Sequence, residues 1–404
     1  MPYDGAVSLF WIAVVAALSP LLAGLIPRRL VPEVVFLLVF GILIGPYVLG
    51  WAGSNDAIEL IRELGLGMLF LLAGYEIEIR EVTGRGGRRA AATWLICFVS
   101  ALVAVVVIGL VSTVEAEIAV AIALTSTALG TLLPILRDNG LLRTPLGANV
   151  LNHGAYGEVG PVVAMAVLLG AHGAAGSIIL LLVLFAVAVL LTLPAARLRD
   201  GSSPLMKIIR TGSDTTAQTG VRLTLLLLIS LGVLALVFDL DLVLGAFAAG
   251  FVLRQAVPQG DTRLEHKLNG LAFGFLIPVF FVTSGMSIDP QAVFSAPLVL
   301  ITFVILMLLL RGLPVFLVSA LTREPGTTQR TFSTRESVQI GLFGATGLPV
   351  IVAVTSVAER NGQLSAQSAS LLVAAGAITV LLLPMTAILL GSGRSQDRPA
   401  PALN

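Results

Sequence analysis

Residues 116–136 read AEIAVAIALTSTALGTLLPIL, an apolar segment long enough to cross a bilayer that is interrupted near its middle. Thr125, Ser126 and Thr127 stand at mid-depth, and a glycine and a proline follow them. Glycine and proline weaken or end helices. The segment therefore predicts a membrane helix that is broken at its centre.

A second interrupted segment lies near the end of the chain. Residues 341–354 read GLFGATGLPVIVAV and place Gly344, Thr346 and Gly347 at a similar depth, before a proline. Small residues also allow close helix packing in membranes, so each segment taken alone has that simpler interpretation. As a pair, the two segments favour an ion site, because broken membrane helices require protein or a water-filled cavity around their freed backbone groups.

Composition indicates a membrane protein. Of 404 residues, 57% are hydrophobic and 12% are charged, against about 25% charged residues in soluble domains. The net charge of +1 and the lack of a basic cluster argue against a nucleic-acid partner. Cys97 is the single cysteine, which excludes an internal disulfide or a cysteine metal site. No Walker loop, HExxH or nucleophile elbow is present, so we expect a protein that is not an enzyme and has no cofactor and no metal besides a transported cation.

Thirteen apolar segments have about the length that a membrane helix needs. They are 7–26, 31–50, 58–77, 90–112, 116–136, 147–168, 176–195, 221–238, 241–256, 268–287, 294–321, 334–358 and 367–390. Alternate loops hold most of the 24 Lys and Arg residues, which predicts a multi-pass protein with its N-terminus outside and its C-terminus in the cytoplasm. We expect 1–390 to be the membrane domain, 196–220 a linker between its halves and 391–404 a short, disordered cytoplasmic tail.

The order of the spans suggests an internal repeat. If spans 2–6 and 9–13 are repeats, they enter the membrane from opposite sides, and the interrupted helices are the fourth of each. Transporters with inverted repeats place such helices at the membrane midplane. We therefore expect an all-α polytopic protein of about thirteen transmembrane helices, with two inverted five-helix repeats and crossed interrupted helices.

Glu158 is a carboxylate deep in a predicted span, GANVLNHGAYGEVGPVVAMAVLLG. Ionisable groups at this depth are costly and usually functional. Burial disfavours the charged form, so we expect Glu158 to exchange a proton for a cation, each excluding the other. The alternative is a static ion pair or hydrogen-bond network.

Arg311, in MLLLRGLPVF, is the second deep charge. It remains protonated under all ordinary conditions. Three roles are open: pairing with Glu158, setting the field around the site, or anchoring a helix end by snorkelling.

Other polar residues are weaker candidates. His153 lies about 140° around the helix from Glu158, which favours a packed or pathway residue over a second proton carrier. The further candidates for the site are Asn152, His153, Gly157, Gly344 and Thr346.

Several stretches carry a family resemblance. They are VPEVVFLLVFGILIGPYVLG, LGMLFLLAGYEIE, ALTSTALGTLLPILRDNGLL, the spacing from Gly147 to Glu158, and IPVFFVTSGMSID. Through them, residues 7–390 resemble the monovalent cation:proton antiporter superfamily, in the branch that includes potassium-efflux antiporters and bacterial sodium/proton exchangers.

The resemblance implies a homodimer in the inner (plasma) membrane that exchanges Na⁺ or K⁺ for H⁺ by alternating access. It implies a scaffold of spans 1–3 and 7–10 and a moving core of spans 4–6 and 11–13. By position, Thr125, Ser126 and Thr127 would form the unwound crossing, Glu158 the ion-binding carboxylate and Arg311 the basic residue of the core.

The sequence departs from the family pattern beside the carboxylate. The family usually has Asp preceded by Asp, Asn or Gln, where this chain has Gly157 and Glu158. The missing carboxylate pair favours electroneutral one-for-one exchange and leaves the preferred cation open. Two alternatives remain: a carrier of an organic anion or ionophore-like metabolite bound by Arg311, and a non-transporting membrane protein on the same scaffold.

Overall fold

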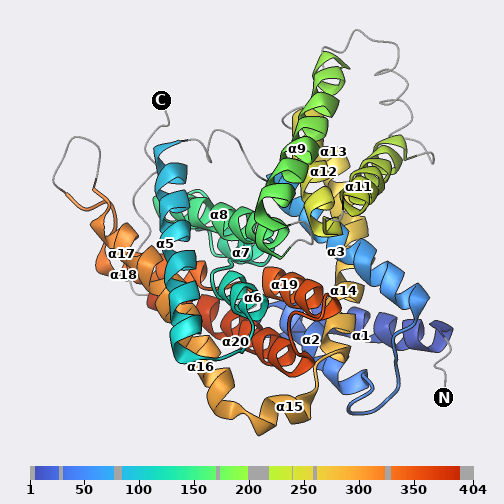
Figure 1. The fold of residues 1–404 in the computed structure, drawn as a ribbon, viewed down its shortest axis with the longest axis horizontal. Coiled ribbons are helices and arrows are strands. Elements are labelled where there is room, and N and C mark those ends of the chain that lie inside the picture. The colour runs from blue at the N-terminus through green and yellow to red at the C-terminus, as the bar shows by residue number, and fades with distance from the viewer. Residues whose placement is uncertain are drawn as a thin grey trace. The chain divides into compact units, whose positions relative to one another are not determined.

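The computed structural model describes residues 5–26, 31–76, 84–169, 173–198, 218–238, 240–257, 262–323 and 329–391 (Figure 1). Apart from an isolated bridge between Arg323 and Arg330, the secondary structure of these residues is helical. The prediction of an all-α protein is therefore confirmed. The expected linker 196–220 and tail 391–404 lie mostly outside the described residues.

Within the described ranges, eight helical segments are long and apolar enough to cross a membrane. Three shorter apolar helices accompany them, at Glu33–Ile44, Gly176–Leu190 and Leu242–Ala256. Each of the thirteen expected spans overlaps one or more helices. The chain is thus a multi-pass membrane protein, and the count of thirteen crossings remains a prediction.

The chain divides into two compact units. Unit 1 comprises Met1–Ala16, Trp51–Ile77 and Ala166–Thr283, and unit 2 comprises Ala17–Gly50, Glu78–Met165 and Ser284–Asn404. Unit 1 contains the first part of α1 (Gly5–Leu25), α3 (Asp56–Glu76), α9 (Gly173–Leu198), α11 (Thr219–Val237), α12 (Leu242–Ala256), α13 (Thr262–Leu271), the π-helical segment η2 (Ala272–Leu276) and most of α14 (Ile277–Met286).

Glycines bring the backbones of α3 and α12 together in unit 1. A Cβ added to Gly74 would meet the carbonyl of Phe247, and one added to Gly250 would meet the carbonyl of Leu71. Small residues allow such close helix approach in membranes, where apolar burial against lipid contributes little. Gly74 and Gly250 therefore determine how tightly this pair packs.

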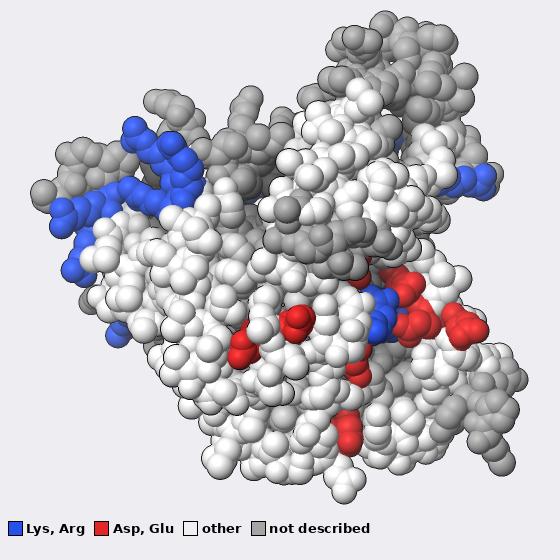
Figure 2. All heavy atoms as spheres, viewed as in Figure 1, with Lys and Arg blue, Asp and Glu red and all other residues white. Residues whose placement is uncertain are grey.

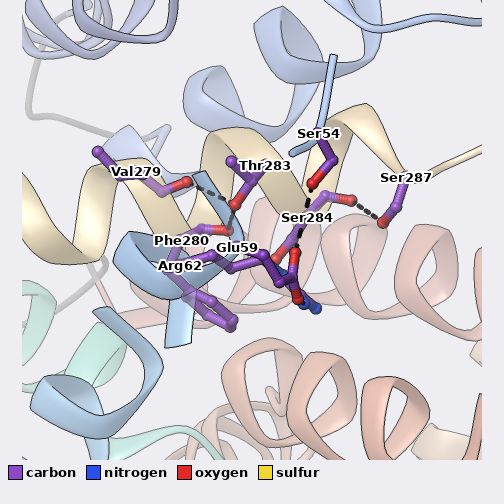
Figure 3. Close-up of polar contacts among 8 residues, drawn as sticks. All are labelled: Ser54, Glu59, Arg62, Val279, Phe280, Thr283, Ser284 and Ser287. Carbon is purple, nitrogen blue, oxygen red and sulfur yellow. Dashed lines mark hydrogen bonds and ion pairs between the residues drawn. The ribbon is translucent and has the colours of Figure 1, made fainter. Parts of the chain in front are cut away.

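Two polar contacts of unit 1 lie within single helices (Figure 3). On α14, the Thr283 hydroxyl donates to the carbonyls of Val279 and Phe280 at 2.7 and 3.0 Å. On α3, Glu59 forms an ion pair with Arg62 one turn away. These local bonds keep polar groups compatible with an apolar setting.

Unit 2 contains the interrupted segments and Glu158. Its helices are the end of α1, α2 (Glu33–Ile44), α5 (Arg85–Ile108), α6 (Val114–Leu124), α7 (Leu129–Asp138), most of α8 (Pro145–Leu168), α15 (Pro290–Ser295), α16 (Pro297–Met307), the π-helical segment η3 (Leu308–Gly312), α17 (Leu313–Leu321), α18 (Thr334–Gly344), α19 (Leu348–Arg360) and α20 (Ala366–Gly391).

Helix α5 begins earlier and ends earlier than the expected range of 90–112. It starts at Arg85, and Gly109 ends it in the left-handed conformation with φ 69°, which glycine adopts without strain. Arginines of its first turns are exposed, and Figure 2 shows basic side chains gathered over this end of α5. The exposed Glu115 lies in α6, which follows the opposite end of α5.

Both π-helical segments precede a proline. Segment η2 ends two residues before Pro278, and η3 ends two residues before Pro314. Proline lacks the N–H that a helix needs, and its ring clashes with the carbonyl four residues earlier, so the helix widens locally. In unit 2, this widening falls on Arg311.

Candidate ion-binding site

The two expected helix breaks are present in unit 2. Helix α6 ends at Leu124 and α7 begins at Leu129, while α18 ends at Gly344 and α19 begins at Leu348. The Thr125 hydroxyl is occupied at the end of its own helix, where it donates to the carbonyls of Ala121 and Ile122 at 3.0 and 3.1 Å.

Hydrogen bonds join one break to the other. The Ala128 N–H donates to the Thr346 carbonyl at 2.7 Å, and the Ser126 hydroxyl donates to the Gly347 carbonyl at 3.1 Å. The Thr127 hydroxyl donates to the Gly344 carbonyl. Backbone groups freed by the breaks thus satisfy polar groups of the opposite break, as membrane burial requires.

Glu158 of α8 lies beside this crossing and is 4% exposed. Its Oε1 accepts a 2.7 Å hydrogen bond from the backbone N–H of Leu129, the first residue of α7. Its Oε2 is buried without a hydrogen-bond partner among the described residues. A helix N-terminus favours a negative charge, so α7 stabilises the carboxylate through Oε1. Oε2 takes no part in this contact.

Arg311 is fully buried in η3. Its Nε donates to Thr127 Oγ1 at 3.1 Å and to the Gly344 carbonyl at 3.3 Å, and its Nη2 donates to the His153 carbonyl at 2.6 Å. These acceptors lie on the crossing and on α8, so the Arg311 contacts in this conformation do not include Glu158. Complete burial also distinguishes Arg311 from a snorkelling side chain.

Gly157 lies where the crossing, Arg311 and α8 meet. Its carbonyl accepts a 2.8 Å hydrogen bond from the Thr127 N–H. A Cβ added at Gly157 would lie 2.5 Å from Thr127 Cβ and 2.6 Å from Arg311 Nη2, closer than real Cβ contacts allow. The position has no room for a side chain.

The remaining candidates lie in different surroundings. The His153 imidazole is buried, and its Nδ1 has no hydrogen-bond partner among the described residues. Asn152 packs against Gly86 of α5. Thr346 contributes its carbonyl to the crossing, while its hydroxyl donates to the Leu342 carbonyl at 3.2 Å.

Sequence reasoning missed two participants. Cys97 Sγ lies 3.9 Å from Arg311 Nη1, and Leu129 supplies the N–H that contacts Glu158. A signal for Cys97 was present, because the buried residues Ala90, Thr93, Cys97 and Ala101 follow helical spacing along one face of α5. Leu129 contributes its backbone N–H, and no sequence pattern of side chains indicates such a contact.

The geometry suits reversible binding of one small positive species. A buried carboxylate is neutral with a proton bound, and with a cation bound its charge is balanced instead. The free Oε2 is the atom at which either would bind. Hydroxyl and carbonyl groups of Ser126, Thr127 and Thr346 lie in the adjoining crossing, where they take part in the hydrogen bonds between the two breaks.

Comparisons with known proteins show which proteins the chain resembles in sequence and in fold. The family model described as "Sodium/hydrogen exchanger, transmembrane" matches residues 13–390. The chain is 22% identical to the putative Na⁺/H⁺ antiporter YjbQ of Bacillus subtilis, over 95% of this chain and 63% of YjbQ. It is 27% identical to the probable Na⁺/H⁺ antiporter GerT of Bacillus cereus, over 81% of this chain and 84% of GerT.

The chain also resembles a longer potassium-efflux protein in sequence and an antiporter of known structure in fold. The glutathione-regulated potassium-efflux protein KefC of Klebsiella pneumoniae is 26% identical over 89% of this chain, which spans 58% of KefC. The sodium proton antiporter MjNhaP1 from Methanocaldococcus jannaschii has a similar fold, with a TM-score of 0.66, 19% identity and coverage of 95% of this chain and 98% of that one. The chain thus spans under two thirds of YjbQ and KefC but nearly all of MjNhaP1.

Proposed function

The chain belongs to the sodium/hydrogen exchanger family, and from this premise we propose that it exchanges a monovalent cation, Na⁺ or K⁺, for protons across the membrane. The observation that carries the proposal is the buried Glu158 carboxylate, which has one oxygen on the N-terminus of α7 and the other without a hydrogen-bond partner in the described part of the chain. Proton and cation compete for this carboxylate, so the two ions cross in opposite directions.

The ion site consists of Glu158 with oxygen ligands from the crossing at Ser126, Thr127 and Thr346. Arg311 supplies a fixed positive charge and holds the crossing against α8. The single carboxylate gives one-for-one, electroneutral exchange, because the site carries one unit of charge in either direction.

The working assembly is a homodimer in the plasma membrane, with the N-terminus outside and the C-terminus in the cytoplasm. Support for this orientation comes from the exposed arginines at the start of α5 and the acidic Glu115 after its far end, because cytoplasmic loops are enriched in Lys and Arg. Spans 4–6 and 11–13, which apart from residues 166–168 lie within unit 2, form the core that alternates access to the site.

The organic-anion carrier is less well supported. It requires Arg311 to bind the anionic group of the substrate. The Arg311 donors Nε and Nη2 already contact oxygen acceptors of the protein, and Nη1 contacts Cys97. The non-transporting alternative offers no reason for a buried carboxylate with a free oxygen, which is costly to maintain.

Proton movement in proteoliposomes tests the proposal. A pH-sensitive dye reports the gradient while sodium, potassium, lithium or rubidium is added to vesicles containing the wild type, Glu158→Gln or Glu115→Gln. Glu115 is exposed on α6 and receives the same chemical change, so it is the matched control.

A cation should dissipate the pH gradient in the wild type and in Glu115→Gln, and should have no effect in Glu158→Gln. If no cation acts on the wild type, the exchange function is wrong. If Glu158→Gln still exchanges, the function stands and its assignment to Glu158 is wrong.

A further inference from the structure

Gly157 lies between two tightly packed neighbours in unit 2. On one side lies Thr127 of the crossing, bound to Gly157 through a 2.8 Å backbone hydrogen bond. On the other side lies the Arg311 guanidinium, which passes over Gly157 to reach the His153 carbonyl one helical turn earlier on α8. Both neighbours are themselves held, because Arg311 and Thr127 also share a hydrogen bond.

We propose that Gly157 is a positioning residue: because it has no side chain, Thr127 and Arg311 can pack against α8 at this point. The site then operates with Glu158 as its one carboxylate. This inference rests on the proposed exchange at Glu158. It differs from a role for Gly157 as an ion ligand, since the space that a ligand side chain would need is filled by Thr127 and a guanidinium.

A side chain at position 157 would collide with both neighbours. An added Cβ lies within 2.6 Å of Arg311 Nη2 and within 2.5 Å of Thr127 Cβ, so one of them has to move. Thr127 is a β-branched residue fixed by backbone and side-chain hydrogen bonds, and Arg311 is fully buried. Neither has the freedom of an exposed flexible side chain, so the crossing shifts away from Glu158.

Any side chain at position 157 is therefore harmful, an acidic one included. We expect Gly157→Ala and Gly157→Asp to lower the exchange rate about a hundredfold each, because displacement of a site by about 1 Å has effects of that order. An added acid thus removes activity and does not create a second ion ligand. The control is Gly24→Ala, which adds the same methyl group to α1, also in unit 2, at a position where no described atom lies within 4 Å.

Two experiments test the inference in the full chain. The first measures cation-driven proton movement in proteoliposomes for the wild type and the three glycine variants. The second measures melting temperatures in detergent for Gly157→Ala, Thr127→Gly and the double variant. If Gly157 acts through Thr127, Gly157→Ala lowers the melting temperature less when Thr127 is already glycine.

Non-additive melting temperatures, with exchange lost in Gly157→Ala and Gly157→Asp and kept in Gly24→Ala, support the inference. Additive melting temperatures, or exchange at the wild-type rate in Gly157→Asp, overturn it. If the wild type exchanges no cation, the proposed function is wrong. The melting temperatures of the single and double variants still test the role of Gly157, because that experiment requires no transport.

Discussion

The backbone N–H of Leu129 donates a 2.7 Å hydrogen bond to Oε1 of Glu158, so the N-terminus of α7 meets a carboxylate carried by α8. A helix that begins inside a membrane has N–H groups without intrahelical partners. Glu158 satisfies one of them, and the positive end of the helix dipole stabilises the carboxylate in return. The broken helix and the buried carboxylate thus stabilise each other.

Shortening the Glu158 side chain by one carbon tests this interaction. In Glu158→Asp the carboxylate is one carbon closer to α8 and cannot keep its bond to Leu129 while remaining in the same place. We expect exchange to persist with the half-saturating cation concentration raised about tenfold or more, because a hydrogen bond to a charged group contributes roughly 1.5–3 kcal/mol. Titration of the cation in proteoliposomes measures this, with Glu115→Asp as the control. An unchanged half-saturating concentration would contradict the role of Leu129.

Competition at one carboxylate predicts a specific pH dependence. Protonation cancels the charge that holds the cation, so lowering the pH should raise the half-saturating cation concentration and leave the maximal rate at saturating cation unchanged. Initial rates at several cation concentrations and several pH values distinguish this from other schemes. A maximal rate that falls with pH at a constant half-saturating concentration would show that the two ions bind at separate sites.

Replacing Arg311 with lysine should be damaging although the charge is kept. The guanidinium reaches Thr127, Gly344 and His153 at once, and a single ammonium group cannot reproduce that geometry. Each lost charge-assisted bond is worth roughly 1.5–3 kcal/mol, so Arg311→Lys should melt at a clearly lower temperature and exchange more slowly. Arg335→Lys, at an exposed position, is the control and should match the wild type. Equal melting temperatures for both variants would refute the anchoring role.

The α3–α12 contact offers a test of packing in unit 1. Gly250→Ala places a methyl group against the Leu71 carbonyl and should destabilise the protein by about 1–3 kcal/mol, the usual cost of overpacking. Gly270→Ala adds the same methyl group to a helix where nothing lies within 4 Å, and it should be neutral or stabilising by up to about 1 kcal/mol. Thermal unfolding compares the two, and a Gly250→Ala variant as stable as Gly270→Ala would show that this contact is loose.

Local composition was enough to predict the elements of the fold. Apolar length gave the helices, and the polar run at Thr125–Thr127 and the glycines around Thr346 gave both breaks, because these residues weaken helices wherever they occur. The expected spans 221–238 and 241–256 likewise correspond to α11 and α12. The early start of α5 was missed, since its arginines have high helix propensity but low hydropathy.

The sequence was enough to single out residues of the candidate site, but not to predict which partners they contact. Glu158 and Arg311 were singled out because deep charges are rare, but their partners lie far away in sequence. Arg311 contacts Thr127 across 184 residues, and no local pattern encodes that contact. Gly157 was interpreted as a missing ligand, because a glycine within a helix does not reveal which neighbours its absent side chain admits. That information exists only in the packed structure.

The hydrogen bonds between the two breaks have a consequence for the dynamics of the backbone. Irregular segments usually exchange their amide hydrogens with solvent quickly, since their N–H groups open with little cost. Here the amides of Thr127, Ala128 and Leu129 lie outside helical hydrogen bonding, yet they donate to Gly157, Thr346 and Glu158 in turn. Deuterium uptake at these three amides should therefore be among the slowest in the chain. In the proposed transport cycle, we expect the crossing to move as one rigid body.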